Sequence, residues 1–148
     1  MRSRLAPRYF APMAPSLVTV WLGKSFILRH LSNPPRDPAW TQFLEELRER
    51  APERMLVSAE VGLSALQRTE MRDAMGRTPP SMAVLTTSVA SLATLRILSV
   101  FMGQRIRGFH PSNASEAIAW LGVPVEDREK FSHHLAELLA TKPSRMAS

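Results

Sequence analysis

The alternation of hydrophobic and polar residues is most informative between residues 81 and 111, where an apolar run precedes a long apolar helix pattern and a shorter alternating run. The run Met82-Ala83-Val84-Leu85 contains no polar residue and follows two prolines, which is typical of a strand buried on both faces. Ser88 can cap the helix and Gly103 can end it. The pattern predicts one βαβ crossover, with a strand over 82–87, a helix over 89–102 and a strand over 105–109.

Two β-rich runs lie upstream, Leu17 to Leu22 and Ser25 to Leu31, and Gly23-Lys24 separates them. A glycine at the first position of a two-residue loop favours a type II′ hairpin, so these runs should pair antiparallel. Asp37 before Pro38 then predicts a helix start, because the carboxylate can cap the helix and proline suits its first turn. The apolar stripe of that helix is formed by Trp40, Phe43, Leu44 and Leu47.

Two capping boxes predict further helix starts. Ser64 with Gln67 opens a helix that should stop at Gly76, after a buried strand over 54–59. Asn113 with Glu116 opens a short helix that should end at Leu121, before Gly122. The last helix is expected over about 125–140.

Strands that alternate with helices favour parallel pairing through right-handed crossovers. The predicted fold is therefore α/β: a mixed, mostly parallel five-stranded sheet with the helices on one face, built from an initial hairpin, alternating helices and strands, and two final helices. Arg105 and Arg107 alternate with apolar residues, so the last strand should lie at a sheet edge. We expect a disordered basic arm over 1–15, a single domain over 16–141 and a basic tail over 142–148.

The formal net charge of +6 does not indicate a nucleic-acid-binding surface, because the excess lies in the two ends. Residues 16–141 hold fourteen Lys and Arg against thirteen Asp and Glu, without the clustered basic face of a nucleic-acid-binding domain. The uncharged stretch from Thr78 to Leu95 opens with prolines and is rich in Ser and Thr, which argues against a membrane span. No apolar leader is recognised, so a cytoplasmic location is expected.

Polar residues follow the predicted parallel strands, and ligands of open α/β sheets bind at the carboxyl ends of the strands. This set consists of Glu60, Ser64, Thr86, Thr87, Ser88, His110, Ser112 and Asn113. It could form a crevice for a phosphate or for a partner's side chain, but helix capping explains most of its members.

Catalysis and metal binding find little support in the sequence. His110 beside Glu60 or Ser64 could suggest a hydrolytic pair, yet no nucleophile elbow surrounds Ser64 or Ser88. His133 and His134 are adjacent on a helix and diverge by about a hundred degrees, so they cannot bind one metal from the same side. The chain has no cysteine. We therefore expect no enzyme activity, no cofactor and no metal.

The helix over 89–102 is apolar on most sides, which allows two interpretations. It can be a core helix that crosses the sheet, or its apolar face can be exposed as an interface or a lipid groove. Four of its residues would line an apolar ligand pocket against the sheet: Leu92, Leu95, Leu98 and Phe101.

A family resemblance rests on packing motifs spread over about residues 17–122. They are Trp40 with Phe43, Met55-Leu56-Val57, Ala65-Leu66-Gln67-Arg68, Met82-Ala83-Val84-Leu85-Thr86, Leu98-Ser99-Val100-Phe101, Ile106-Arg107-Gly108-Phe109-His110-Pro111 and Ala117-Ile118-Ala119-Trp120-Leu121-Gly122. With the predicted element order, they resemble the bacterial STAS-like branch of the anti-sigma-factor-antagonist (STAS) superfamily, which is related to CRAL-TRIO lipid-transfer domains.

The resemblance implies a non-catalytic regulatory module with a protein partner, or alternatively a module that binds a small apolar ligand or lipid. Antagonists of this superfamily carry a phosphorylatable serine at the start of the helix after the third strand, in an Asp-Ser-Ser-Gly-like turn. Here Ser64 alone matches that turn in place. A phosphate on Ser64 would be opposed by Glu60 and could pair with Arg68. Thr87, Ser88 and His110 would complete the candidate phosphate or partner site.

Overall fold

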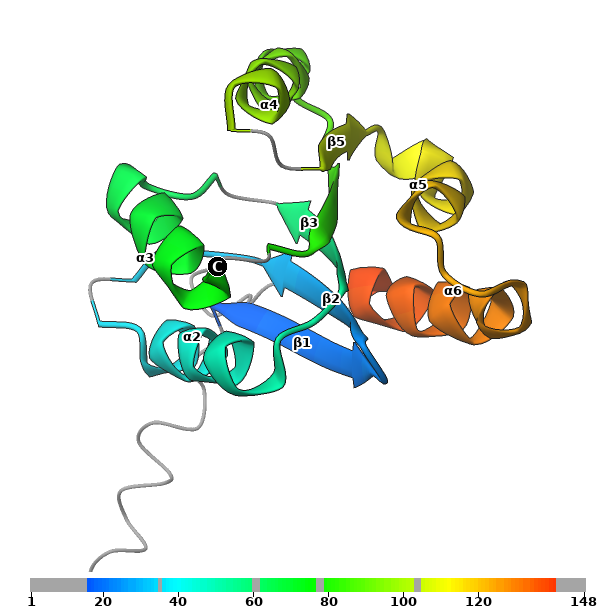
Figure 1. Ribbon diagram of the computed structural model, residues 1–148, viewed down its shortest axis with the longest axis horizontal. Coiled ribbons are helices and arrows are strands. Elements are labelled where there is room, and N and C mark those ends of the chain that lie inside the picture. The colour runs from blue at the N-terminus through cyan, green and yellow to red at the C-terminus, as the bar shows by residue number, and fades with distance from the viewer. Residues whose placement is uncertain (1–15, 35, 60–61, 77–78, 103–104, 141–148) are drawn as a thin grey trace, which may run out of the picture.

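A computed structural model of the protein describes residues 16–34, 36–59, 62–76, 79–102 and 105–140, without the side chains of residues 59 and 98–102. The predicted arm over 1–15, the tail over 142–148 and the helix stop at Gly103 lie outside the described residues. The elements, drawn in Figure 1, are β1 (Leu17–Leu22), β2 (Ser25–His30), α2 (Pro38–Arg50), β3 (Arg54–Ala59), α3 (Ala65–Met75), β4 (Ser81–Leu85), α4 (Val89–Met102), β5 (Ile106–Phe109), η2 (Pro111–Asn113), α5 (Ala114–Leu121) and α6 (Val125–Ala140).

The five strands form one sheet in the order β1-β2-β3-β4-β5. β1 pairs antiparallel with β2, and the other neighbouring strands pair parallel. Gly23 has the positive φ, 62°, that a type II′ turn requires at its first position. The prediction of an α/β fold with a mixed, mostly parallel five-stranded sheet is confirmed.

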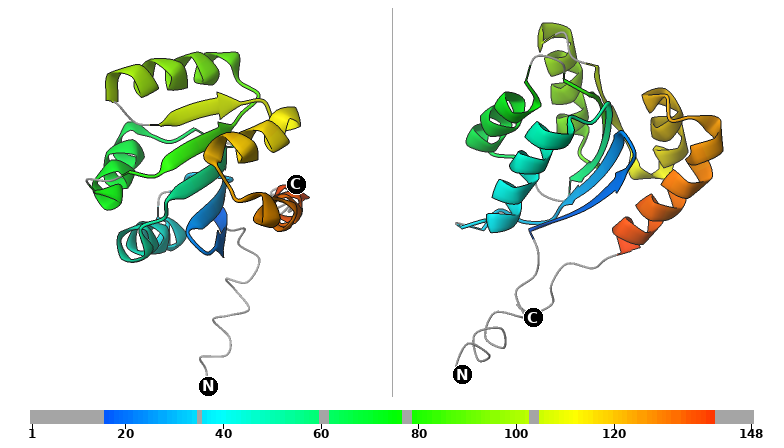
Figure 2. Two further views of the ribbon diagram at one scale, coloured as in Figure 1. Left: turned by 45° about the vertical axis from the view of Figure 1, so that its right-hand side comes forward. Right: turned by 60° about the horizontal axis from the view of Figure 1, so that its bottom comes forward.

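Helices cover both faces of this sheet, as Figure 2 shows in its right-hand view. The three crossover helices α2, α3 and α4 lie on one face, in agreement with the prediction. The prediction of a single covered face is corrected for α5 and α6, which lie on the opposite face. The handedness rule constrains only helices that join parallel strands. These two helices follow the last strand, so they are free to cover the second apolar face.

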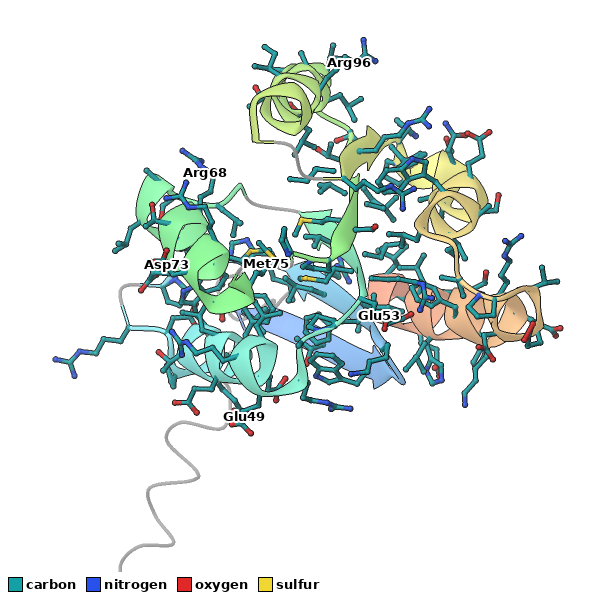
Figure 3. The ribbon with its side chains drawn as sticks, viewed as in Figure 1. Glu49, Glu53, Arg68, Asp73, Met75 and Arg96 are labelled. Carbon is teal, nitrogen blue, oxygen red and sulfur yellow. The ribbon has the colours of Figure 1, made fainter. Side chains whose placement is uncertain are left out.

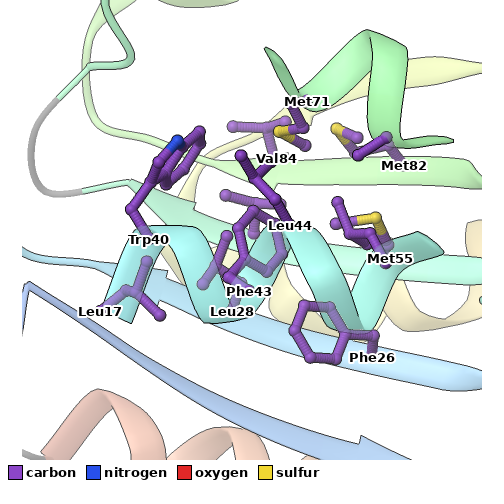
Figure 4. Packing of buried hydrophobic residues seen from close by; sticks show 13 residues of the cluster. Leu17, Phe26, Leu28, Trp40, Phe43, Leu44, Met55, Met71, Met82 and Val84 are labelled. Atoms are coloured by element: carbon purple, nitrogen blue, oxygen red, sulfur yellow. The ribbon is translucent and has the colours of Figure 1, made fainter. Parts of the chain in front are cut away.

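Alternating strand residues build the two cores. On the face of α2 and α3, Phe26, Met55 and Met82 pack beneath Phe43 and Leu44 (Figure 4). On the face of α5 and α6, residues one position along the same strands pack against the helices: Ile27, Leu56, Ala83 and Leu85 contact a cluster that includes Ile118, Phe131 and Leu135. The strands β2, β3 and β4 are thus buried on both sides, which accounts for their continuous apolar runs.

A buried arginine secures the end of α6. Arg29 on β2 is 6% exposed. Its Nη1 donates to the carbonyl oxygens of Leu138 (2.9 Å) and Leu139 (3.1 Å). Carbonyls in the last turn of a helix have no partner within the helix, and a cation there is favoured by the helix dipole. Arg29 therefore ties α6 to the sheet.

Helix starts follow the predictions at α2 and α3 but not at α5. Asp37 Oδ1 accepts a hydrogen bond from the Trp40 amide (3.1 Å), and the capping box of Ser64 and Gln67 is complete. The capping box predicted at Asn113 is wrong, because the Asn113 side chain makes no cap hydrogen bond. Asn113 instead ends the 3-10 turn η2, which leads directly into α5 and makes a separate cap unnecessary.

β5 forms one sheet edge, as predicted, and Arg107 is exposed there. The guanidinium of Arg107 lies over Phe109 at 5.0 Å, and that of Arg105 lies over Trp120 at 4.7 Å. In the described ranges, no helix combines the length and apolar character that crossing a membrane requires.

Candidate functional site

The carboxyl edge of the sheet gathers most of the polar residues singled out in the sequence. The parallel strands β3, β4 and β5 all end at this edge, and α3, α4 and η2 begin there. Ser64, Thr87, Ser88 and His110 are all exposed. Glu60 lies outside the described residues. The structure therefore brings the described candidates to one edge.

Most of these side chains cap a helix or a turn. Ser64 Oγ accepts from the Gln67 amide (3.1 Å), and Gln67 Oε1 accepts from the Ser64 amide (2.9 Å). Ser88 Oγ accepts from the Ser91 amide (3.1 Å) and caps α4. Thr86 is buried, and its Oγ1 accepts from the Ser88 amide (3.1 Å). These bonds are those that orphaned N–H groups at helix starts require.

His110 is engaged by its own turn. Its Nδ1 accepts from the Ser112 amide (3.1 Å) and lies 2.8 Å from Ser112 Oγ. The imidazole is exposed. One ring nitrogen thus helps to form η2, and this contact, rather than a pairing with Ser64, explains the position of the histidine.

Arg68 lies beside the start of α3, on the side that faces away from α2 (Figure 3). Its Nη1 donates to the carbonyl oxygen of Leu63 (2.8 Å), the residue before Ser64. The guanidinium has five N–H donors, and this bond uses one of them.

A depression that the sequence did not predict adjoins Ser64. It has a volume of about 290 Å³ and lies between the N-terminal ends of α2 and α3. Its lining residues are Asn33, Pro34, Asp37, Trp40, Thr41, Ser64, Leu66, Gln67 and Glu70. The indole N–H of Trp40 donates to Glu70 Oε1 (3.1 Å), which joins the two helices. Trp40 and Glu70 fall on different helices with unrelated patterns, so no sequence signal could bring them together.

Large apolar side chains are exposed at the same edge. Leu66, in the first turn of α3, is 68% exposed, and Val89, the first residue of α4, is 80% exposed. Ile97 in the middle of α4 is 56% exposed. Among its described side chains, α4 therefore presents apolar groups to solvent on one side, while Leu92 and Leu95 are half-buried.

Two of the four residues predicted to line the apolar pocket lie against β5. Leu92 and Leu95 are half-buried. They lie so close to Gly108 of β5 that a Cβ there would be 2.5 Å from Leu92 Cδ2 and 3.1 Å from Leu95 Cδ1. The side chains of Leu98 and Phe101 lie outside the described residues. Arg96 points outward from α4 (Figure 3).

The two adjacent histidines of α6 share one carboxylate. His133 Nε2 and His134 Nδ1 each lie 3.6 Å from Glu137 Oε1. His134 is half-buried, whereas His133 is exposed. Across the described residues, no three His, Cys, Asp or Glu side chains are grouped in a way that could hold a metal ion.

Comparisons of the chain with models of protein families, with curated proteins and with solved structures found no match. The resemblance to the STAS-like branch therefore stays a prediction that rests on the packing motifs and the predicted element order.

Proposed function

We propose that this protein is a cytoplasmic, non-catalytic regulatory module of STAS-like type that binds a protein partner at the carboxyl edge of its sheet. The observation that carries the proposal is the exposure of Leu66 (68%) and Val89 (80%) beside the exposed caps Ser64 and Ser88. Burying an aliphatic side chain of this size contributes about 1.5–3 kcal/mol. Polar groups around an apolar centre are the usual anatomy of a protein interface.

Ser64 is the proposed point of regulation. Its hydroxyl is exposed at the start of a helix, where backbone N–H groups and the helix dipole favour an anion. A phosphate there would add nearly two negative charges, with Arg68 available to pair. Glu70 also lines the depression next to Ser64 and would oppose the added charge. Phosphorylation would therefore change the charge of the surface that meets the partner.

The partner-binding proposal is tested by matched charge insertions. A tagged wild-type chain and the variants Leu66→Glu and Val89→Glu are used to capture partners from a cell extract. The control is Val125→Glu, because Val125 is 73% exposed and begins α6 on the other face of the sheet. We expect the wild type and the control to retain the same protein, and both edge variants to lose it. Equal retention by all four chains would contradict the proposal.

The alternative function is binding of a small apolar ligand or lipid between α4 and the sheet. The half-burial of Leu92 and Leu95 favours it, because a helix held by partly buried side chains can be lifted at modest cost. Native mass spectrometry of the protein purified from cells distinguishes the two functions. A lipid-sized adduct that disappears in Leu92→Asp would favour the alternative, whereas an unliganded chain favours the partner.

A further inference from the structure

The outer edge of β1 is available for pairing. β1 ends the strand order, so within the described part of the chain no strand pairs with its outer side. The opposite edge, β5, is four residues long and carries the exposed Arg107. β1 is six residues long and contains neither a charge nor a proline. Short strands, charges and prolines are the devices that keep sheet edges apart, and β1 has none of them.

The hairpin determines which backbone groups of β1 face outward. Leu22 and Ser25 flank the two-residue loop and are paired. The Leu31 amide donates to the carbonyl oxygen of Ser16 (2.7 Å), in phase with that pair. Even-numbered positions of β1 therefore bond to β2, because hydrogen-bonded and non-bonded pairs alternate in an antiparallel ladder. Leu17, Thr19 and Trp21 direct their N–H and C=O groups outward.

We propose that β1 pairs antiparallel with β1 of a second copy, which joins two five-stranded sheets into one across a two-fold axis. In the register that uses all three outward-facing residues, Thr19 lies opposite Thr19 of the second copy. Leu17 of each copy then lies opposite Trp21 of the other. On the opposite face of the sheet, Val18 of each copy lies opposite Val20 of the other. Each contact joins an apolar or β-branched pair, the kind that stabilises neighbouring strands.

The chain's own residues 1–15 are a poor substitute for the second copy, because Pro7, Pro12 and Pro15 lack the N–H groups of a ladder strand.

Sedimentation equilibrium of the full chain tests the proposal. We expect wild type at twice the chain mass of 16.6 kDa and Thr19→Pro at the single mass. Proline removes only the outward N–H of residue 19, so the β1–β2 ladder is retained. Thr19→Val keeps the N–H and should stay dimeric. A single-mass wild type would overturn the proposal, as would a folded Thr19→Pro variant that stays dimeric.

A second variant and a second measurement cover the remaining outcomes. If circular dichroism shows that Thr19→Pro does not fold, Thr19→Lys replaces it, because two like charges directly opposite each other disfavour pairing. Hydrogen exchange of the Thr19 amide should slow as the concentration rises. Slow exchange in dilute, single-mass protein would show that the chain covers its own edge, which contradicts the proposal. This edge is distinct from the proposed partner site, so the two proposals fail separately.

Discussion

Ser64 at the start of α3 combines a structural role with a proposed regulatory one. Both hydrogen bonds of its capping box are formed. Ser64→Ala should therefore lower the free energy of unfolding by about 1 kcal/mol. Ser64→Asp should keep wild-type stability, because its carboxylate still accepts from the Gln67 amide and interacts favourably with the helix dipole. Urea unfolding of the three chains measures both effects.

The same pair of variants separates capping from regulation. If Ser64 is a phosphorylation site that releases the partner, Ser64→Asp should lose the captured protein at wild-type stability. Ser64→Ala should keep it, despite its lower stability. If instead the less stable Ser64→Ala loses the partner and Ser64→Asp retains it, Ser64 acts only as a helix cap.

At the scale of elements, α4 depends on a single glycine for its position on β5. Gly108 leaves the space that the tips of Leu92 and Leu95 occupy. We expect Gly108→Val to lower the free energy of unfolding by about 1–3 kcal/mol through overpacking, although valine is otherwise favoured in strands. In the Gly108→Val variant, the amide hydrogen-exchange rates of α4 should increase more than those of α2.

The control for this prediction is the double variant Gly108→Val with Leu92→Ala. Removing the Leu92 side chain makes room for the valine, so the two changes should cost less together than the sum of the single changes. Strict additivity would show that α4 does not rest on Gly108 through this contact.

At the scale of the whole molecule, the two cores share the same strands, so they should unfold together. Leu47 is 1% exposed on one face and Leu135 is 3% exposed on the other. Alanine at either position should cost about 2–5 kcal/mol. Trp40 and Trp120 report on the two faces separately. In single-tryptophan backgrounds, each alanine variant should shift both fluorescence transitions equally. A variant that shifts only the tryptophan on its own face would show two independent layers.

The sequence determined the elements of this protein and most of their ends. Hydrophobic periodicity and capping act over a few residues, so Asp37, Ser64 and Gly122 mark helix ends without reference to the rest of the chain. The same pattern predicted the antiparallel hairpin, the parallel pairing of the later strands and the edge position of the last one. The full order β1-β2-β3-β4-β5 became known only from the structure.

Tertiary structure decided what each apolar face contacts. Periodicity indicates that Ile118 and Phe131 are buried, but not that they cover the sheet face opposite α2. The apolar composition of α4 left core and surface both open, and only its place over β5 exposed Val89. The depression is lined by Trp40 and Glu70, which are hydrogen-bonded to each other although they lie thirty positions apart in the sequence. Such features depend on which surfaces come into contact after folding. A local sequence pattern does not indicate which distant residues it will contact.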